Sequence, residues 1–389
     1  MQGTETDQRM GLEALRKGNM LKAREHLGRA MAGGRTDAAT LLALANACRS
    51  LDDQAGKLAA VERLLSVEPR NVRALLIKAD HLAGAGDPRS AASFYQAAVR
   101  FAPPPNQVPP DLAPELRRAQ EMNERYAAQY QSYIVEQLRA RGFDGRTSSQ
   151  RFAQSLDIVL GRRQIYLQQP RYYYFPGLPQ IQFYDRQLFP WLDEVERATA
   201  DVRSELMAIL GEPGTFAPYV QGDASRPYNN QAGMLNNPAW SAFYLWKNGE
   251  PVPENAARCP RTLQALRNAP LARVQNRSPS ILFSLMQAGA HIPPHNGLIN
   301  TRLICHLPVL VPGVAEFRVG NEVRPWVEGR AWAFDDTIEH EAWNRADSTR
   351  VILLFDVWRP ELSEEERALV VALFESIDAY AGRKPEWSI

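Results

Sequence analysis

The sequence has few cysteines, no excess of one charge and no long apolar run, and each lack excludes a class of protein. Three cysteines, Cys48, Cys259 and Cys305, lie too far apart for a disulfide framework or a CxxC metal site. Lys and Arg total 45 against 44 Asp and Glu, so no net charge attracts nucleic acid. No apolar stretch approaches the roughly 20 residues that cross a bilayer, and the N-terminus lacks the apolar core of a signal peptide. We therefore expect a cytoplasmic protein with no membrane span and no nucleic-acid partner.

The N-terminal part of the chain repeats with a period of 34 residues. Turn residues recur at Asn19, Asp53 and Asp87, and closing prolines recur at Pro69 and Pro103. With small residues where helices would touch, this pattern resembles the tetratricopeptide repeat, of which about three copies are the minimum for a stable stack. The alternative is an unrelated Ala/Leu-rich helical bundle.

Proline and helix signals divide the chain into three parts. The run APPPNQVPPDLAP at 102–114 contains six prolines, which exclude helix and central strand. A long helical pattern follows it and stops near Gly142. We predict tetratricopeptide-like repeats over 1–105, a proline-rich linker with a connecting helix over 106–165, and a strand-rich domain over 166–389.

The third part begins with short aromatic and proline-rich pieces and one amphipathic helix near 190–211, and it ends with a helix capped by Ser363. Between these helices, several short strands lie close together with turn residues between them. This spacing indicates an antiparallel barrel or jelly roll, so the whole chain is predicted to be a multidomain α + β protein. The expected strands are 281–289, 302–311, 315–320, 330–335 and 350–358.

Four of the six histidines, His291, His295, His306 and His340, fall in this strand-rich part. Neutral imidazole binds iron, zinc, copper and nickel, which makes the group a candidate metal site. The alternative for each is a hydrogen-bonded structural histidine. The two prolines between His291 and His295 exclude a helix that would place both rings on one face. A metal ligand here therefore needs a partner from elsewhere in the sequence.

Arg350 begins the last predicted strand, ten residues after His340. In a barrel, side chains from facing strands converge at the mouth, and an arginine nearby can enter the same cavity. Its planar guanidinium suits a carboxylate bound by two hydrogen bonds. Iron oxygenases that consume 2-oxoglutarate need both features, imidazole ligands for the metal and a cation for the keto acid.

Three sequence stretches resemble the aspartyl/asparaginyl β-hydroxylase family. They are HNGLINTRLICHLPVLVP at 295–312, FDD-x-x-EHE-x-W at 334–343 after W-x-E-G, and FDVWRPEL at 355–362. The similarity extends over about 235–375, and the middle motif is far more specific than a bare histidine pair. The resemblance implies a double-stranded β-helix (cupin-like) fold, an Fe(II) cofactor, and 2-oxoglutarate and O2 as co-substrates.

The resemblance also implies roles for five residues. His295 and His340 match the iron ligands of the family. Arg350 matches the residue that binds the distal carboxylate of 2-oxoglutarate, and His306 and Ser284 match its other polar contacts. For Ser284 the alternative is a strand serine paired with backbone.

Other positions near these motifs are less distinctive. Gly297 stands where most enzymes of this chemistry have Asp or Glu, and glycine there is a feature of this family, with water expected in place of the carboxylate. His291 is matched in part of the family and is interpreted as supporting or structural. Asp335 and Asp336 either orient His340 or form a turn. Trp240 is either packing or cavity wall.

Two substitutions separate this sequence from the animal members of the family. Those proteins have arginine at the position of Ile304 and aspartate at the position of Ala239, and the arginine binds the substrate carboxylate. Arg302 is retained without an assigned role, and Cys259 lacks the partner expected near the animal substrate region. A bacterial cytosolic hydroxylase with a different substrate fits these departures.

The repeats suggest the kind of substrate, because tetratricopeptide stacks usually bind peptide or protein segments. We predict a 2-oxoglutarate- and Fe(II)-dependent dioxygenase that hydroxylates an unactivated C–H bond of an amino-acid residue in a peptide or protein docked through the repeats, with release of succinate and CO2. One alternative is the same chemistry on a free small molecule. Others are a repeat scaffold with a silent barrel and a zinc hydrolase that uses the same histidines.

Overall fold

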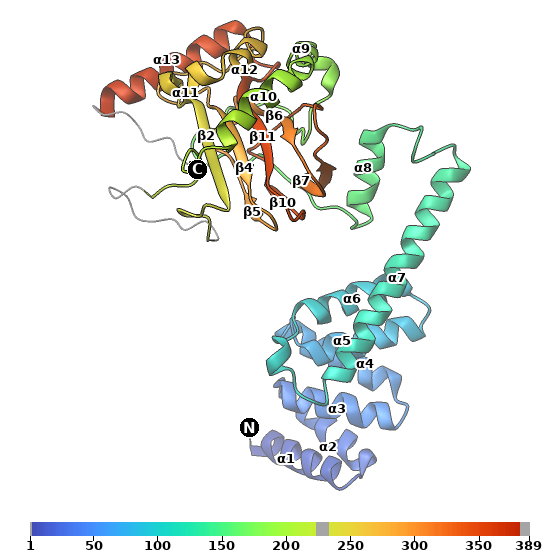
Figure 1. Ribbon diagram of the computed structural model, residues 1–389. Helices are drawn as coiled ribbons and strands as arrows, with labels where there is room; N and C mark the ends of the chain where they lie inside the picture. Colours follow the sequence, from blue (N-terminus) through green and yellow to red (C-terminus); the bar gives the residue numbers. More distant parts are fainter. Residues whose placement is uncertain (1, 223–232, 382–389) are drawn as a thin grey trace. The chain divides into compact units, whose positions relative to one another are not determined.

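A computed structural model describes residues 2–222 and 233–381 and divides the chain into two compact units, Met1–Leu160 and Gly161–Ile389. The first unit is helical, and the second contains two antiparallel sheets with flanking helices (Figure 1). The predicted multidomain α + β class is therefore confirmed. The division falls inside the 106–165 segment that was predicted as linker and connecting helix.

The first unit begins with three consecutive helix pairs, and Figure 1 shows them stacked side by side. A longer helix then packs against the third pair, and a short helix follows it. No helix in the described ranges is long and apolar enough to cross a membrane. The elements are α1 (Gln2–Arg16), α2 (Met20–Ala32), α3 (Ala38–Ser50), α4 (Gln54–Val67), α5 (Val72–Gly84), α6 (Pro88–Arg100), a 3-10 turn (Pro105–Gln107), α7 (Ala113–Ala140) and α8 (Gln150–Val159).

The 34-residue period corresponds to helix starts. Asn19, Asp53 and Asp87 are the N-caps of α2, α4 and α6, and each side chain accepts a hydrogen bond from the backbone N–H three residues later. Inside the first pair, a Cβ on Gly11 would lie 2.6 Å from Cγ of Leu27, so only glycine allows this approach of the two helices. The repeated cap residues therefore mark where the second helix of each pair begins. In the first pair, Gly11 also allows the two helices to pack closely.

The helices of the second unit lie before, between and after the strands. The single helix predicted near 190–211 is divided at Ala198, which ends one helix and precedes the next. The elements are a 3-10 turn (Arg186–Leu188), α9 (Leu192–Arg197), α10 (Thr199–Leu210), α11 (Pro253–Arg258), α12 (Pro260–Ala265) and α13 (Glu364–Ala381).

The strands form two antiparallel sheets. The larger sheet has the order β1-β2-β4-β11-β6-β9 with β3 on β2, and the smaller has the order β5-β10-β7-β8. All five predicted strands are present, and the prediction omitted the others. The strands are β1 (Ala217–Pro218), β2 (Trp240–Lys247), β3 (Glu250–Pro251), β4 (Ile281–Met286), β5 (His291–His295), β6 (Arg302–Leu310), β7 (Ala315–Val319), β8 (Glu322–Pro325), β9 (Trp332–Phe334), β10 (His340–Asn344) and β11 (Arg350–Trp358).

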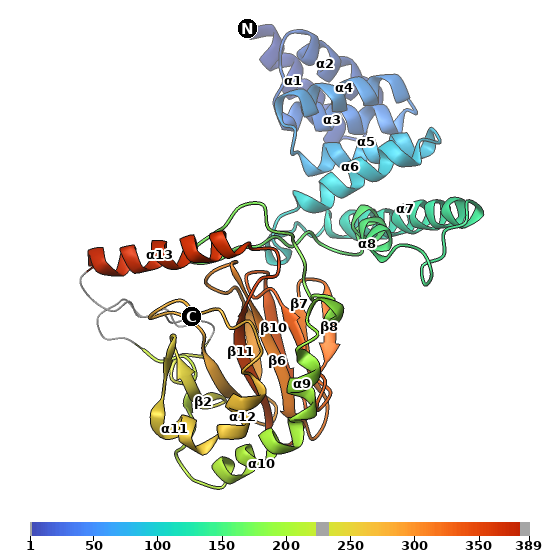
Figure 2. The ribbon, with the colours of Figure 1, turned by 90° about the horizontal axis from the view of Figure 1, so that it is seen from above.

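Alternation along the central strands separates two cores. In β11, the odd-numbered Val351, Leu353 and Phe355 pack with α9 and α10 on the outer face of the large sheet, where Figure 2 shows these helices. Ile352 and the even-numbered neighbours face the second core between the two sheets. Because successive strand residues point to opposite faces, one sequence supplies both a helix-covered core and an inner wall.

The prolines of β5 lie at a sheet edge. His295 is the last residue of β5, and Pro293 and Pro294 lie inside this strand. Within the described residues β5 pairs on one side, with β10, so the missing proline N–H groups cost little. The edge position therefore allows a proline-containing segment to present His295 on a strand.

Candidate active site

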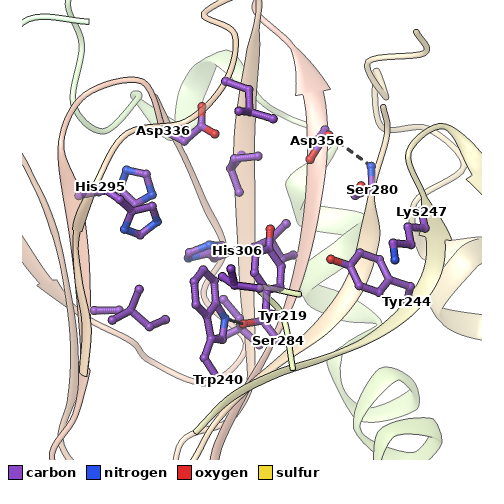
Figure 3. Close-up of a pocket in the computed structure, with 18 of the residues that line it drawn as sticks. Tyr219, Trp240, Tyr244, Lys247, Ser280, Ser284, His295, His306, Asp336 and Asp356 are labelled. Atoms are coloured by element: carbon purple, nitrogen blue, oxygen red, sulfur yellow. Dashed lines mark hydrogen bonds between the residues drawn. The ribbon is translucent and has the colours of Figure 1, made fainter. Parts of the chain in front are cut away.

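A cavity of about 720 Å³ lies between the two sheets (Figure 3). All five residues predicted for the site line it: His295, His306, His340, Arg350 and Ser284. They come from both sheets, since β5 and β10 belong to the small sheet and β4, β6 and β11 to the large one. The fold therefore gathers into one cavity residues that the sequence places far apart.

The two proposed metal ligands are strand neighbours. His295 on β5 and His340 on β10 are paired in register, and their ring centroids are 4.1 Å apart. Nδ1 of His295 lies 2.8 Å from the carbonyl oxygen of Pro293, and Nδ1 of His340 lies 3.1 Å from that of Ile338. A carbonyl only accepts, so each Nδ1 carries the proton and each Nε2 keeps its lone pair.

Burial keeps these imidazoles neutral. It lowers the pKa of His295 and holds the pKa of His340 well below the usual range, because a charged ring would lose its hydration. Neutral imidazole is the form that binds a metal ion. The pair therefore offers two oriented nitrogen donors.

A carboxylate fills the space beside Gly297. A Cβ on Gly297 would lie 2.1 Å from Oδ2 of Asp336, and the backbone N–H of Gly297 donates to the carbonyl of Asp336 over 2.6 Å. The space beside Gly297, the position where most enzymes of this chemistry have Asp or Glu, is thus occupied by a carboxylate from the loop before β10. Within the described residues, no group of three or more His, Cys, Asp or Glu side chains is arranged to hold a metal ion.

Arg350 is a buried cation without a carboxylate partner among the described residues. It is 1% exposed, and its Nη1 and Nη2 donate to the carbonyl of Ser284 and to Sδ of Met286 over 3.1 and 2.6 Å. Its Nε has no hydrogen-bond partner in the described structure, and its guanidinium carbon lies 4.1 Å from the ring centroid of Trp326. Burial lowers the pKa of Arg350 to about 9. An anionic ligand would remove this electrostatic penalty.

His306 and Ser284 lie beside Arg350 with defined hydrogen bonds. Trp326 Nε1 donates to Nδ1 of His306 over 3.4 Å, so the neutral ring carries its proton on Nε2. Burial and the charge of Arg350 hold the pKa of His306 well below its usual range. Trp240 Nε1 donates to the hydroxyl oxygen of Ser284 over 3.2 Å, which leaves the Ser284 proton available to another acceptor. Trp240 is also cavity wall.

A second buried arginine lies in the same cavity. Arg302, Ile304 and His306 are alternate residues of β6 and all line the cavity. The side chain of Arg302 therefore lies on the same face of the strand as that of His306. Nη2 of Arg302 lies 3.2 Å from Oδ2 of Asp336, and Nε lies 3.7 Å from Oδ2 of Asp356. Asp356 was not among the residues predicted from the sequence. This residue lies six positions after Arg350 in β11, so strand alternation places both side chains on one face and could have identified it.

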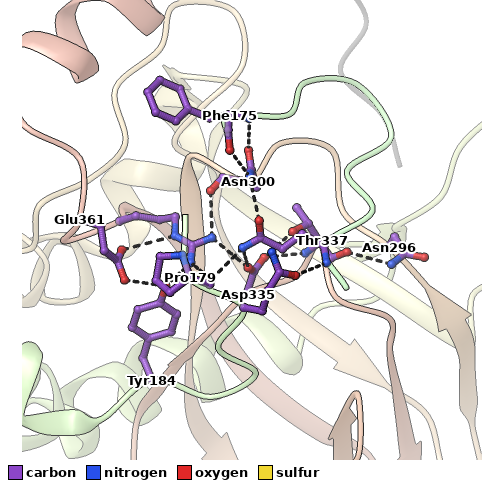
Figure 4. A network of polar contacts seen from close by, with 11 residues as sticks. Phe175, Pro179, Tyr184, Asn296, Asn300, Asp335, Thr337 and Glu361 are labelled. Atoms are coloured by element: carbon purple, nitrogen blue, oxygen red, sulfur yellow. Dashed lines mark hydrogen bonds and ion pairs between the residues drawn. The ribbon is translucent and has the colours of Figure 1, made fainter. Parts of the chain in front are cut away.

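Asp335 belongs to a structural network outside the cavity lining (Figure 4). It accepts hydrogen bonds from Arg359 Nη1 over 2.9 Å, from Gln168 Nε2 over 2.6 Å and from the hydroxyl of Thr337 over 2.6 Å. These contacts tie the loop before β10 to the end of β11 and to the segment before α9. Asp335 thus holds the loop that presents its neighbour Asp336.

His291 lies outside the cavity lining. It begins β5, its side chain is 46% exposed, and its ring stacks on Trp343 with centroids 5.3 Å apart. Its Nε2 lies 3.1 Å from a carboxylate oxygen of Glu341. His291 therefore lies at the surface, although only four positions separate it from His295.

The fold and cavity define a double-stranded β-helix domain with a histidine pair and a buried arginine. Residues 196–360 match the family model for aspartyl/asparaginyl beta-hydroxylase, so the similarity to this family that the motifs predicted is confirmed.

Two named proteins are similar to about half of this chain. The ornithine lipid ester-linked acyl 2-hydroxylase of Rhizobium tropici is 33% identical over 187 residues, which are 47% of this chain and 62% of that protein. The human aspartyl/asparaginyl beta-hydroxylase is 39% identical over 182 residues, 46% of this chain and 22% of that protein. The chain therefore spans less than two thirds of either relative.

A solved structure is similar to the helical part of the chain. The TPR2B domain of yeast Sti1 matches 33% of this chain and 99% of its own, with 19% identity and a TM-score of 0.28.

Proposed function

We propose that the second unit is an Fe(II)- and 2-oxoglutarate-dependent hydroxylase. The observation that carries the proposal is Arg350, a buried guanidinium with no carboxylate partner among the described residues, in the same cavity as the paired histidines. A site that keeps an unpaired cation out of water suits an anionic co-substrate. The histidine donors are imidazoles, which suit Fe(II).

The residues present fit the metal and the keto acid. His295 and His340 would hold Fe(II) through Nε2, since each Nδ1 is bound to backbone. Arg350 would bind the distal carboxylate, with the proton donors of His306 and Ser284 beside it. When bound, Fe(II) with 2-oxoglutarate supplies the oxidation of an unactivated C–H bond by O2, with succinate and CO2 as products.

The chain itself positions the reactants and excludes water. Strand pairing of His295 with His340 sets the ring geometry before any ligand arrives. Asp336, with one buried oxygen lacking a partner in the described structure, can accept a hydrogen bond from water beside Gly297. Apolar residues of both sheets, including Ile292, Ile304 and Ile352, surround these polar groups and keep bulk water away.

Anaerobic titration of the full chain with Fe(II) and 2-oxoglutarate tests the proposal. We expect a weak visible absorption band from the chelate, and we expect His340→Ala to lose it. His291→Ala is the matched control, because this histidine is exposed outside the cavity lining and should leave the band unchanged. Absence of the band in the unmodified protein, or its survival in His340→Ala, would contradict the proposal.

The substrate is proposed to be an amino-acid residue of a peptide or protein. Support comes from the helix-pair unit, because stacks of this kind present concave surfaces that usually bind peptide segments. Succinate formation should be measured over a library of peptides and free amino acids. Stimulation by free amino acids alone would assign the same chemistry to a small molecule.

A further inference from the structure

The two buried arginines of the cavity have opposite electrostatic surroundings. Arg350 has no carboxylate partner among the described residues, whereas Arg302 lies between the carboxylates of Asp336 and Asp356. When both carboxyls are ionised, the group formed by Arg302, Asp336 and Asp356 carries one negative charge in excess. The Arg302 end of the cavity therefore disfavours an added anion and attracts a positive charge.

Polar atoms at the Arg302 end lack hydrogen bonds within the described structure. These atoms are Nε and Nη1 of Arg302 and Oδ1 of Asp336, on side chains that are 6% and 5% exposed. Both residues line the cavity. The carboxylate of Asp356 accepts a hydrogen bond from the backbone N–H of Ser280 over 3.2 Å. Buried groups of this kind are costly without partners, so they point to a ligand that both accepts and donates.

Aromatic rings form another wall of this end. Tyr219 stacks between Trp240 and Tyr244, with centroid distances of 4.1 and 6.3 Å. At the outer end of the stack, the ammonium of Lys247 lies 5.2 Å from the ring centroid of Tyr244. Figure 3 shows Tyr244 and Lys247 on the side of the cavity away from His295. Ring faces attract cations, and this stack already holds one.

We propose that the Arg302 end binds the head group of an α-amino acid with a free ammonium group. The ammonium pairs with the carboxylate of Asp356 in the part of the cavity that Tyr219 and Tyr244 also line. The neighbouring carbonyl or carboxylate oxygen accepts hydrogen bonds from Arg302. The inference rests on the proposed function, because it names the substrate class of the same site. Such a head group belongs either to a free amino acid or to the first residue of a peptide.

The charges explain why the ammonium must be free. An internal peptide residue would bring a neutral amide N–H to Asp356 and leave the excess negative charge uncompensated. An isolated carboxylate would meet Asp336 and Asp356 as well as Arg302. A head group with both charges pairs each with its complement, and its oxygen supplies the acceptor that the unpaired donors of Arg302 require.

Binding of matched ligand pairs tests the proposal on the full chain loaded with Zn(II) and 2-oxoglutarate. The probes are the twenty L-amino-acid amides and their N-acetyl counterparts, measured by calorimetry or ligand-observed NMR. We expect at least one amide to bind, and its N-acetyl form to bind about tenfold or more weakly, as loss of a charged hydrogen bond implies. The free acid and the corresponding Xaa-Gly dipeptide then separate the two sources. Equal binding of the acetylated form, or no binding by any amide, would overturn the proposal.

A pair of variants locates the binding. Asp356→Asn retains an acceptor for Ser280 but removes the charge, so we expect it to abolish the preference for the free ammonium. Asp347→Asn removes an exposed carboxylate outside the cavity lining and should keep that preference. Persistence of the preference in a folded Asp356→Asn protein would overturn the assignment. Binding of 2-oxoglutarate to the metal-loaded protein is measured separately, so failure of the proposed chemistry is distinguishable from failure of this inference.

Discussion

Arg302 and Arg350 are both buried in one cavity, yet they serve opposite purposes. Arg302 is compensated within the chain by Asp336 and Asp356, and it adds no net positive charge to the cavity. Arg350 is held by a carbonyl, a sulfur atom and the face of Trp326, none of which neutralises it. A buried cation that carboxylates already compensate suits a ligand with both charges, whereas one without compensation suits an anion. Charge balance around a buried group thus separates the two ends of the cavity.

The largest expected effect distinguishes the two arginines by stability. Arg302→Met leaves two buried carboxylates without a cation, so the free energy of unfolding should fall by about 3–5 kcal/mol, as when one partner of a buried ion pair is removed. Arg350→Met removes an uncompensated buried charge and should leave stability unchanged or raised. Urea unfolding of the metal-free proteins measures both. Equal destabilisation by the two substitutions would break the comparison.

The pH dependence of stability, compared between the unmodified protein and Asp336→Asn, probes the Arg302 end. Burial raises the pKa of Asp336 from 3.8 to about 7. Between about pH 4 and pH 7, the folded protein therefore holds a proton that the unfolded chain has released. The stability that this proton adds is complete below about pH 4 and is lost as the pH rises through 7. In metal-free protein, Asp336→Asn should remove up to about 4 kcal/mol of this decline. Urea unfolding between pH 4 and 8 measures it, with Asp347→Asn as control, and an unaltered slope in Asp336→Asn would count against the raised pKa.

Affinity for the keto acid probes the Arg350 end. Arg350→Met should weaken binding of 2-oxoglutarate to the metal-loaded protein by about 30-fold or more, the lower end of the cost of removing one member of a buried charge pair. The stability of the unliganded protein should not fall. Calorimetric titration with 2-oxoglutarate gives the dissociation constant. Undiminished affinity would show that the unpaired guanidinium serves another ligand.

The smallest expected effect concerns the contact beside the histidine pair. Gly297→Ala places a Cβ against the carboxylate of Asp336 and should cost about 1–3 kcal/mol, the usual range for overpacking. In an Asp336→Ala background the obstruction is gone, so the same substitution should cost less. Thermal and urea unfolding of the four proteins of this cycle measure the coupling. Additive costs would mean that Asp336 does not fill this space.

Much of the fold could be predicted from local patterns. The 34-residue period identified the caps at Asn19, Asp53 and Asp87 because cap residues act within a few positions of themselves. The last strand, 350–358, was predicted with the bounds of β11. The prediction failed where tertiary position overrides propensity. Prolines are tolerated in β5 because it is an edge strand, and which strand lies at an edge depends on sheet assembly.

The candidate site likewise has features that the sequence predicts and features that depend on the tertiary structure. Residue types and the motifs that resemble the family made His295, His340 and Arg350 candidates from the sequence alone, while the strand parity of Arg302 stayed open. Only the tertiary structure decided which charges meet. Arg350 lacks a carboxylate partner in the described structure, Arg302 shares two, and Asp336 fills the place beside Gly297. Alternation is set by the backbone of a single strand, whereas charge pairing depends on how strands and loops distant in sequence are brought together.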